Sequence, residues 1–288
     1  MALPDWKRTV SLPATVRLAW HTSESFPRQI PLGELYAPLE FPIRSGALPY
    51  LVANMVMTQN GEATVDGKAT PIGTAVDGLV LTRIRRAVDA VLTGSGTLVH
   101  DDVTAVLPEA EVRHRIAEGR SPRLLVVVVA SSLSFGREIF ARRFFADPGF
   151  DKLMLTGPAA TPERIRIVED RGVEVVRVPA SGQEGRPSLP AVLGILRARG
   201  VRSVTCEGGP RFLPSLFTAR AVREYFLTTS PMITGALDAP RPVFGPVEPA
   251  GAPVLLSRVS RYEHDFDDPR TGARLVEAFD RFHVISPA

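Results

Sequence analysis

Residues 124–129 read LLVVVV, a run of strand length in which apolar and polar positions do not alternate. Strands that are buried on both faces have this pattern, and they are typical of parallel sheets covered by helices on both sides. The segment 50–57 (YLVANMVM) is another apolar stretch of strand length, and 201–206 (VRSVTC) is also predicted to be a strand. The run at 124–129 therefore predicts the central strand of a parallel sheet.

Helical patterns alternate with these strands along the chain. Val80, Ile84 and Ala87 recur at the spacing of one apolar helix face. Thr161 followed by Pro162 is typical of a helix start, because threonine caps the first turn and proline fits its first position. We expect further strands at 90–93, 152–156, 173–178 and 224–229, and further helices at 189–199 and 210–219. The alternation predicts an α/β fold with a mostly parallel central sheet flanked by helices.

Both ends of the chain depart from this alternation. Near the C-terminus, two extended stretches surround the turn 267–272, which predicts an antiparallel hairpin at the edge of the sheet. Prolines interrupt every short apolar run in the first 45 residues. We therefore divide the chain into a proline-rich arm at 1–45, with one short helix near 15–20, and a main domain at 46–288.

The composition is that of an ordinary globular protein and excludes several functional classes. Of 288 residues, 44% are hydrophobic and 23% charged, and the formal net charge is only +3. Because no basic stripe interleaves with aromatic residues, nucleic acid is not an expected partner. The single cysteine, Cys206, excludes an internal disulfide, and no histidines have metal-ligand spacing. The longest apolar run, 124–130, is too short to span a membrane, so we expect a cytoplasmic protein without metal.

Two glycine-containing turns follow predicted strands. Gly94-Ser95-Gly96-Thr97 comes after the strand at 90–93, and Glu207-Gly208-Gly209-Pro210 comes after the strand at 201–206. Glycines at the carboxyl ends of parallel strands let phosphate oxygens approach backbone N–H groups. Tight turns between strands and helices also need glycine for structural reasons, so either turn alone is weak support. Neither is a Rossmann fingerprint or a Walker loop.

Other candidate residues have both a functional and a structural interpretation. Asp101 and Asp102 are either site carboxylates, helix caps or a solvated loop pair. Glu207 is more suggestive, because a carboxylate beside a buried strand rarely lacks a partner. Cys206 fits a small core residue. The pair Arg85-Arg86 is interpreted as part of a solvated helix face.

Three motifs together resemble a known family. They are YLVANMVMTQNG (50–61), AVLTGSGTLVHDD (90–102) and VTCEGGPRFL (204–213), in this order. They resemble the reductase domain of riboflavin biosynthesis, which has the dihydrofolate reductase-like fold, and the resemblance covers about residues 48–284. It implies a homodimer that uses NADPH to reduce a ribosylamino-pyrimidine 5′-phosphate, a small-molecule substrate, to its ribitylamino form.

The resemblance also implies roles for individual residues. Those matching the two cofactor turns are Gly94, Ser95, Gly96, Thr97, Gly208, Gly209 and Pro210. Those on the substrate side are Asn54, Thr58 and Thr74, with Asp101 and Glu207 as the catalytic carboxylates. Ser131, with Ser132, either contacts the 2′-phosphate of NADPH or simply turns the chain, and we assign it to the cofactor.

The sequence departs from the family pattern on the substrate side. Asn60 replaces the usual aspartate before Gly61, Pro71-Ile72-Gly73-Thr74 replaces a tryptophan-containing loop, and Val103 and Ala130 replace a proline and an acidic residue. Two alternatives therefore stay open: reduction of another heterocycle, such as a pterin or a secondary-metabolite precursor, and a nucleotide-binding module without activity. Deamination is excluded, because the zinc deaminase signature H-x-E with P-C-x-x-C is absent.

Overall fold

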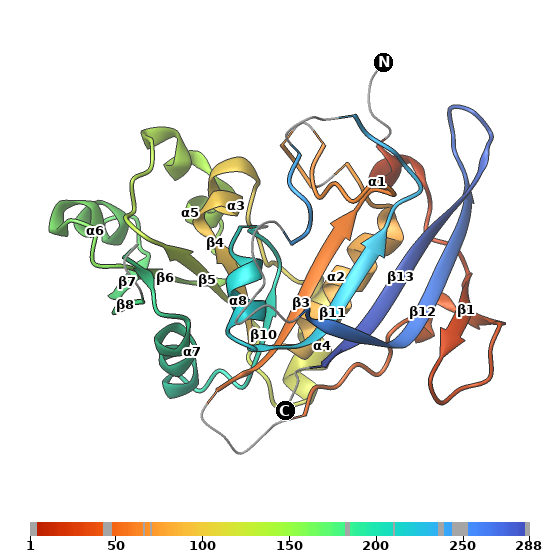
Figure 1. The fold of residues 1–288 in the computed structure, drawn as a ribbon, viewed down its shortest axis with the longest axis horizontal. Helices are drawn as coiled ribbons and strands as arrows, with labels where there is room; N and C mark the ends of the chain where they lie inside the picture. The colour runs from red at the N-terminus through yellow and green to blue at the C-terminus, as the bar shows by residue number, and fades with distance from the viewer. Residues whose placement is uncertain are drawn as a thin grey trace.

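The computed structural model describes residues 5–42, 48–65, 67–69, 71–181, 185–209, 211–235, 239–243 and 253–285. In this part of the chain the strands form an eleven-stranded sheet in the order β2-β1-β12-β13-β11-β3-β10-β4-β5-β6-β7. Figure 1 shows the strands running through the length of the molecule, with helices packed against them. The predicted fold class, α/β with a mostly parallel sheet, is confirmed.

Seven neighbouring strands of this sheet are parallel. They are β3 (Tyr50–Met57), β4 (Ala90–Gly94), β5 (Leu125–Ala130), β6 (Asp151–Thr156), β7 (Glu174–Arg177), β10 (Ser203–Cys206) and β11 (Val222–Thr229). All seven were predicted from the sequence, with bounds that differ by a few residues at most. In β5, Val126–Val129 are buried without alternation, as a strand covered on both faces requires. The fold thus brings the two strands that precede the glycine turns, β4 and β10, side by side.

The antiparallel part of the sheet begins with the C-terminal hairpin. The hairpin consists of β12 (Leu255–Asp267) and β13 (Arg274–Ile285), and β13 pairs with β11. Beyond it, β1 (Thr15–His21) pairs with β12, and β2 (Arg28–Pro31) pairs with β1. The hairpin was expected at the sheet edge, but β2 forms the edge on this side.

The short helix expected near residues 15–20 was wrong, because this segment is strand β1. Val16 and Leu18 are buried while Arg17 between them is not, which is the period of a strand. Pairing with β12, more than two hundred residues later, decides this local structure. The division at residue 45 stays a prediction. Strand β1, which precedes this residue, pairs with β12, which follows it.

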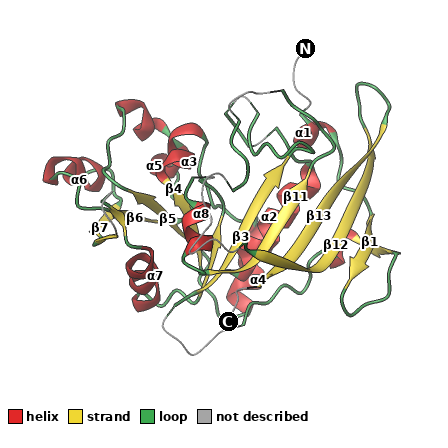
Figure 2. Cartoon of the chain, viewed as in Figure 1, coloured by secondary structure: helices red, strands yellow, loops and turns green. Residues whose placement is uncertain are grey.

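Helices cover both faces of the parallel strands (Figure 2). Side chains of α2 (Ala75–Ala87), α3 (Ser95–His100), α5 (Arg143–Ala146) and α6 (Pro162–Glu169) join one hydrophobic cluster, and those of α7 (Leu189–Ala198) and α8 (Leu213–Thr218) join the other. The remaining helices are α1 (Trp6–Thr9) and α4 (Glu109–Ala117), with two short 3-10 helices, η1 (Leu32–Glu34) and η2 (Arg137–Ala141). Two short strands, β8 (Ala180–Ser181) and β9 (Arg186–Pro187), pair with each other. None of the helices in the described ranges has the length and apolar character needed to cross a membrane.

The predicted start of α6 is confirmed at the level of atoms. The Thr161 hydroxyl accepts a hydrogen bond from the Arg164 backbone N–H, and Pro162 occupies the first turn. The helix that was expected at 210–219 is shorter, and α8 begins at Leu213.

Candidate functional site

The two glycine turns contact each other at the carboxyl edge of the sheet. A Cβ atom on Gly209 would lie 3.3 Å from the backbone nitrogen of Gly94. Gly208 and Gly209 have φ angles of +145° and +77°, which side chains disfavour. A Cβ on Gly208 would lie 3.1 Å from Oγ1 of Thr97. The structure therefore brings both turns together, and glycine at 94, 208 and 209 is already required by this packing.

Gly96 differs from the other glycines of the two turns. It lies exposed in the first turn of α3, and no heavy atom lies within 4 Å of the position a Cβ would take. Packing within the protein therefore does not explain this glycine. The open space beside it is available to a ligand.

Three buried polar atoms on adjacent strands lack hydrogen-bond partners among the described residues. They are Oδ1 of Asn54 on β3, Oγ1 of Thr93 on β4 and Oγ1 of Thr205 on β10. By the alternation of side chains along a strand, all three lie on the face that α2 covers, as Val52 and Val91 do. Thr93 and Thr205 are almost completely covered by the protein, whereas Asn54 is only partly buried. Of the three, Asn54 is therefore the residue that a ligand could approach.

Glu207 is held by an arginine of α2. Nε of Arg85 lies 2.9 Å from Oε1 and its Nη2 lies 2.6 Å from Oε2, a two-pronged contact. Both side chains are largely buried, with exposed fractions of 10% for Glu207 and 15% for Arg85. Such a pair fixes the carboxylate in one orientation. The interpretation of Arg85 as part of a solvated face was wrong, and the partner expected for Glu207 is this arginine.

Glu207 and Asn54 occupy adjoining places on neighbouring strands. Cys206 pairs with Ala53, and each of the two polar residues follows one position later. The site thus combines a fixed carboxylate, an unpaired amide oxygen and the two glycine turns. Such a combination can bind a polar ring and stabilise positive charge near it.

The other predicted carboxylate, Asp101, makes a local contact. It follows α3, and its Oδ1 accepts a hydrogen bond from the backbone N–H of Asp102 at 2.9 Å. Oδ1 of Asp102 in turn accepts from the backbone N–H of Arg143, the first residue of α5. Asp101 thus stabilises its own loop, and Asp102 bonds the first turn of α5. These are the loop and helix-cap roles considered for the pair.

Thr58 and Thr74, predicted on the substrate side, are both fully buried and bonded within the protein. The Thr58 hydroxyl donates to Oδ1 of Asn60 and accepts from the backbone N–H of Glu62, which closes a turn. Thr74 caps α2 by accepting from the N–H of Val76. Their hydroxyl groups therefore serve the turn and the helix cap.

The departure at Asn60 has a physical explanation in this turn. Nδ2 of Asn60 donates to Oε1 of Glu62 at 2.9 Å and to the carbonyl of Thr234 at 2.7 Å. An aspartate could donate neither bond and would repel Glu62. Asn60 and Glu62 therefore form a matched pair on the substrate side.

Ser131 is exposed just after β5, close to a group that sequence reasoning missed. Oγ of Ser132 lies 2.9 Å from Oγ of Ser134, which accepts a hydrogen bond from Arg164 of α6 at 2.6 Å. Two hydroxyl groups and a guanidinium thus gather at the end of β5. No pattern in the sequence links Arg164 to these serines, because the fold alone brings α6 back to this edge.

The last two residues considered in the sequence are Pro210 and Cys206. Pro210 lies outside the described residues. Cys206 is buried in the core as expected, and burial raises the pKa of its thiol to about 12. That thiol is therefore not a nucleophile at neutral pH.

Comparisons with known proteins identify the family of the chain. The sequence profile of the RibD C-terminal domain matches residues 49–263. A curated relative, the 2,5-diamino-6-ribosylamino-4(3H)-pyrimidinone 5′-phosphate reductase of Archaeoglobus fulgidus, is 30% identical over 194 residues, which are 67% of this chain and 84% of that protein.

Solved structures show the same fold. A pyrimidine reductase-like protein of Corynebacterium diphtheriae superposes with a TM-score of 0.65 at 25% identity, covering 89% of this chain and 99% of that one. The deaminase/reductase of Thermotoga maritima gives a TM-score of 0.56 at 18% identity, covering 83% of this chain and 57% of that one. With a profile match over most of its length, the chain belongs to the RibD C-terminal domain family, the pyrimidine reductases of riboflavin biosynthesis.

Proposed function

We propose that this protein is an NADPH-dependent reductase that converts a ribosylamino-pyrimidine 5′-phosphate to its ribitylamino form. The observation that carries the proposal is the contact between the two glycine turns, beside the open space at Gly96 and the unpaired amide oxygen of Asn54. The curated relative named above is a reductase of such a pyrimidinone phosphate.

The residues present fit a dinucleotide phosphate. The space beside Gly96 is open, and the backbone of Gly208 and Gly209 carries no side chain that would block approach. When bound, NADPH would supply the hydride, so the protein has to align its substrate and manage charge and protons. Asn54 would accept a hydrogen bond from the pyrimidine. Glu207, fixed by Arg85, would stabilise positive charge at the nitrogen that joins the ring to the sugar.

The test is turnover of defined substrates. NADPH absorbance is followed with 2,5-diamino-6-ribosylamino-4(3H)-pyrimidinone 5′-phosphate and with 5-amino-6-(5-phosphoribosylamino)uracil, and mass spectrometry identifies a product heavier by two hydrogens. Binding of NADPH without oxidation, with either substrate, would favour the nucleotide-binding module. Oxidation only with a dihydropterin would point to another heterocycle.

We also propose that the protein acts as a homodimer, as the family resemblance implies. Light scattering coupled to size-exclusion chromatography measures the molar mass directly. A mass equal to that of one chain, 31.2 kDa, at working concentration would contradict this.

We expect Arg164 to determine the choice of cofactor. If the serine–arginine group at the end of β5 meets the 2′-phosphate, Arg164→Met removes a charge-assisted hydrogen bond worth roughly 1.5–3 kcal/mol. The KM for NADPH should then rise at least about tenfold, while the KM for NADH changes little.

Arg166 provides the matched control. It is exposed on the same helix, and residues two positions apart on a helix do not share a face. Arg166→Met should leave both KM values unchanged. If the two variants behave alike, Arg164 does not contact the 2′-phosphate.

A further inference from the structure

A buried acidic pair lies where α2 begins. Glu277 of β13 is fully buried, and Asp77 in the first turn of α2 is 6% exposed. Glu277 Oε1 accepts a hydrogen bond from the Thr74 backbone N–H at 2.9 Å, and Oε2 accepts from the Thr74 hydroxyl. A Cβ on Gly73 would lie 2.5 Å from Oδ2 of Asp77, so that carboxylate folds closely over the segment. The two acids thus contact the segment before α2 at Gly73 and Thr74.

Lys7 of the N-terminal helix α1 supplies a positive charge to this pair. Its Nζ lies 3.3 Å from Oδ2 of Asp77. Burial, followed by the charge of Asp77, raises the pKa of Glu277 from its ordinary value of 4.5 to about 8. The hydrogen bonds from Thr74, and after them the charge of Lys7, oppose the increase. His264 of β12 also faces the cluster, with Nδ1 3.5 Å from the Thr74 hydroxyl, and burial lowers its pKa. Asp265 and Arg274 act on His264 from the hairpin.

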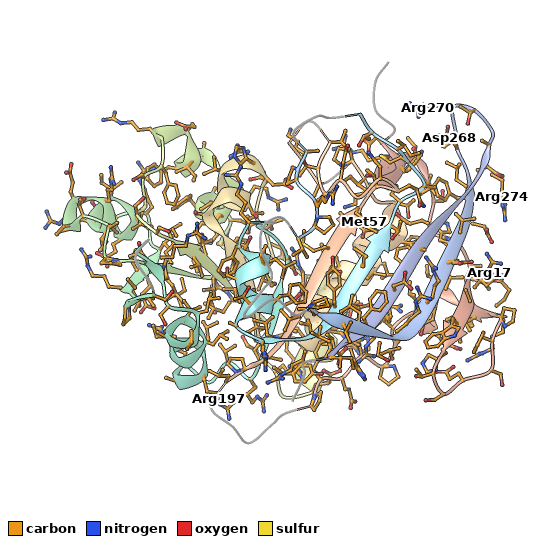
Figure 3. All side chains as sticks on the ribbon, viewed as in Figure 1. Arg17, Met57, Arg197, Asp268, Arg270 and Arg274 are labelled. Atoms are coloured by element: carbon orange, nitrogen blue, oxygen red, sulfur yellow. The ribbon has the colours of Figure 1, made fainter. Side chains whose placement is uncertain are left out.

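Helix α1 is firmly anchored in this position. Trp6 is 3% exposed, and its Nε1 donates to Oδ1 of Asp268 at 3.1 Å. The Trp6 ring packs edge-on against the ring of Phe266, with 5.3 Å between the two ring centroids. Figure 3 shows Asp268 near the tip of the β12–β13 hairpin, and Figure 1 places α1 beside the start of α2. Lys7 is therefore held over the acidic pair by its neighbour in the helix.

The residues that hold α1 in place also contact the segment beyond the carboxyl ends of β3 and β11. Met232, just beyond β11, packs against the cluster that contains Trp6 and Phe266. The carbonyl of Met232 accepts a hydrogen bond from the backbone N–H of Gln59, in the turn that follows β3. Contacts of α1 thus extend to the turn that carries the departure at Asn60. Lys7 and Glu277 both lie outside the segment that the family profile matches, residues 49–263.

We propose that Lys7 is a positioning residue for the active site, which holds the Asp77–Glu277 pair and thereby orders residues 71–77 at the substrate-side edge. Without this cation, the largely buried carboxylate of Asp77 would lose its ion-pair partner. Glu277, which already holds a proton below about pH 8, offers no positive charge in its place, so the segment would have to move. The catalytic part of this inference rests on the proposed function, because substrate KM is one of its readouts.

The test uses Lys7→Met in the full chain, with Lys7→Arg as the conservative variant and Arg8→Met as the matched control. The Arg8 side chain is 86% exposed and pairs only locally with Asp5. We expect Lys7→Met to lower kcat/KM for the pyrimidine at least about tenfold through misplacement of the segment, with the KM for NADPH unchanged. Lys7→Arg should restore most of the loss, as should Asp77→Asn in the Lys7→Met background, because that change removes the charge that needs a partner.

A second readout does not depend on turnover. Because the pKa of Glu277 is higher in the folded protein than in the unfolded chain, its stabilisation is present at acidic pH and is lost as pH rises toward about 8. The urea midpoint of the wild type should therefore fall over this range. Lys7→Met should extend the fall to higher pH, and Glu277→Gln should remove it.

The outcomes separate the two proposals. If the wild type reduces no pyrimidine but the urea midpoints follow this pattern, the cluster stands and the proposed function fails. If Lys7→Met matches Arg8→Met in the pH dependence of unfolding and in substrate KM, the inference about Lys7 is wrong. Lower stability at every pH, with an unchanged KM and no rescue by Asp77→Asn, would likewise overturn it.

Discussion

A valine at position 96 is expected to weaken NADPH binding at least ~100-fold, which corresponds to ~2.7 kcal/mol, while the protein folds as before. Gly96 is exposed, and nothing in the protein lies within 4 Å of its Cβ position, so the free protein accommodates the side chain. Valine also costs no more than glycine in a helix. The added methyl groups would occupy the space that the cofactor needs for close approach to the first turn of α3.

Gly194→Val is the control for this experiment. Gly194 lies in α7, on the opposite face of the sheet from α3, and it too has no neighbour within 4 Å of its Cβ position. Fluorescence titration with NADPH and thermal melting are measured for both variants. Equal affinities would remove the turn 94–97 from the cofactor site.

Gly209→Val, the variant that the sequence alone suggests, would not separate binding from folding. A Cβ on Gly209 would lie 3.0 Å from Cβ of Phe212 and 3.3 Å from the backbone of Gly94, at a φ of +77°. The substitution would therefore disturb the packing of the two turns whether or not a cofactor binds there.

The fold could be predicted from sequence wherever the local pattern and the tertiary environment agree. Strand β3 was predicted with the bounds that it has, because its apolar run is buried and ends in turn residues. Strand β1 was not, because its burial arises from pairing with β12 at the other end of the chain. Helix α3 was missed since its short span contains Ser95 and Gly96, which are typical of turns.

The candidate site was predictable in its backbone but less so in its side chains. Adjacent parallel strands necessarily bring the turns after them together, so Gly94 and Gly209 meet as their positions implied. The contacts of long arginine side chains could not be predicted in this way. Arg85 reaches Glu207 from α2, and the apolar periodicity of that helix does not indicate the contact. Thr58 and Thr74 matched a family motif, yet their hydroxyl groups are bonded within the protein.

Glu207→Gln is expected to lower kcat about 10²-fold, the scale of one preorganised electrostatic contact, with NADPH affinity within a few-fold of the wild type. The amide keeps the size of the side chain but puts an NH2 group where one oxygen accepts from Arg85, so the change removes the charge and also weakens that contact. The Arg85 variants described below separate the two effects. An interaction made mainly in the transition state is lost from kcat and kcat/KM together. Steady-state kinetics with the pyrimidine substrate measure both.

Asp101→Asn serves as the comparison, and its effect should be smaller. Oδ1 of Asp101 accepts a hydrogen bond from the Asp102 backbone, and an amide oxygen preserves that bond. Normal turnover in both variants would show that neither carboxylate is catalytic, and the site would then retain only its proposed cofactor function.

The contribution of Arg85 distinguishes a positioned carboxylate from one that merely lies nearby. If the two-pronged contact orients Glu207, Arg85→Met should also lower kcat, and the double variant Arg85→Met/Glu207→Gln should be no slower than Glu207→Gln alone. Each single change leaves one charge of a largely buried pair without its partner, and such a loss costs stability. Kinetics are therefore measured well below the melting temperature of each variant. Effects on kcat that multiply in the double variant would mean that Arg85 acts independently of Glu207.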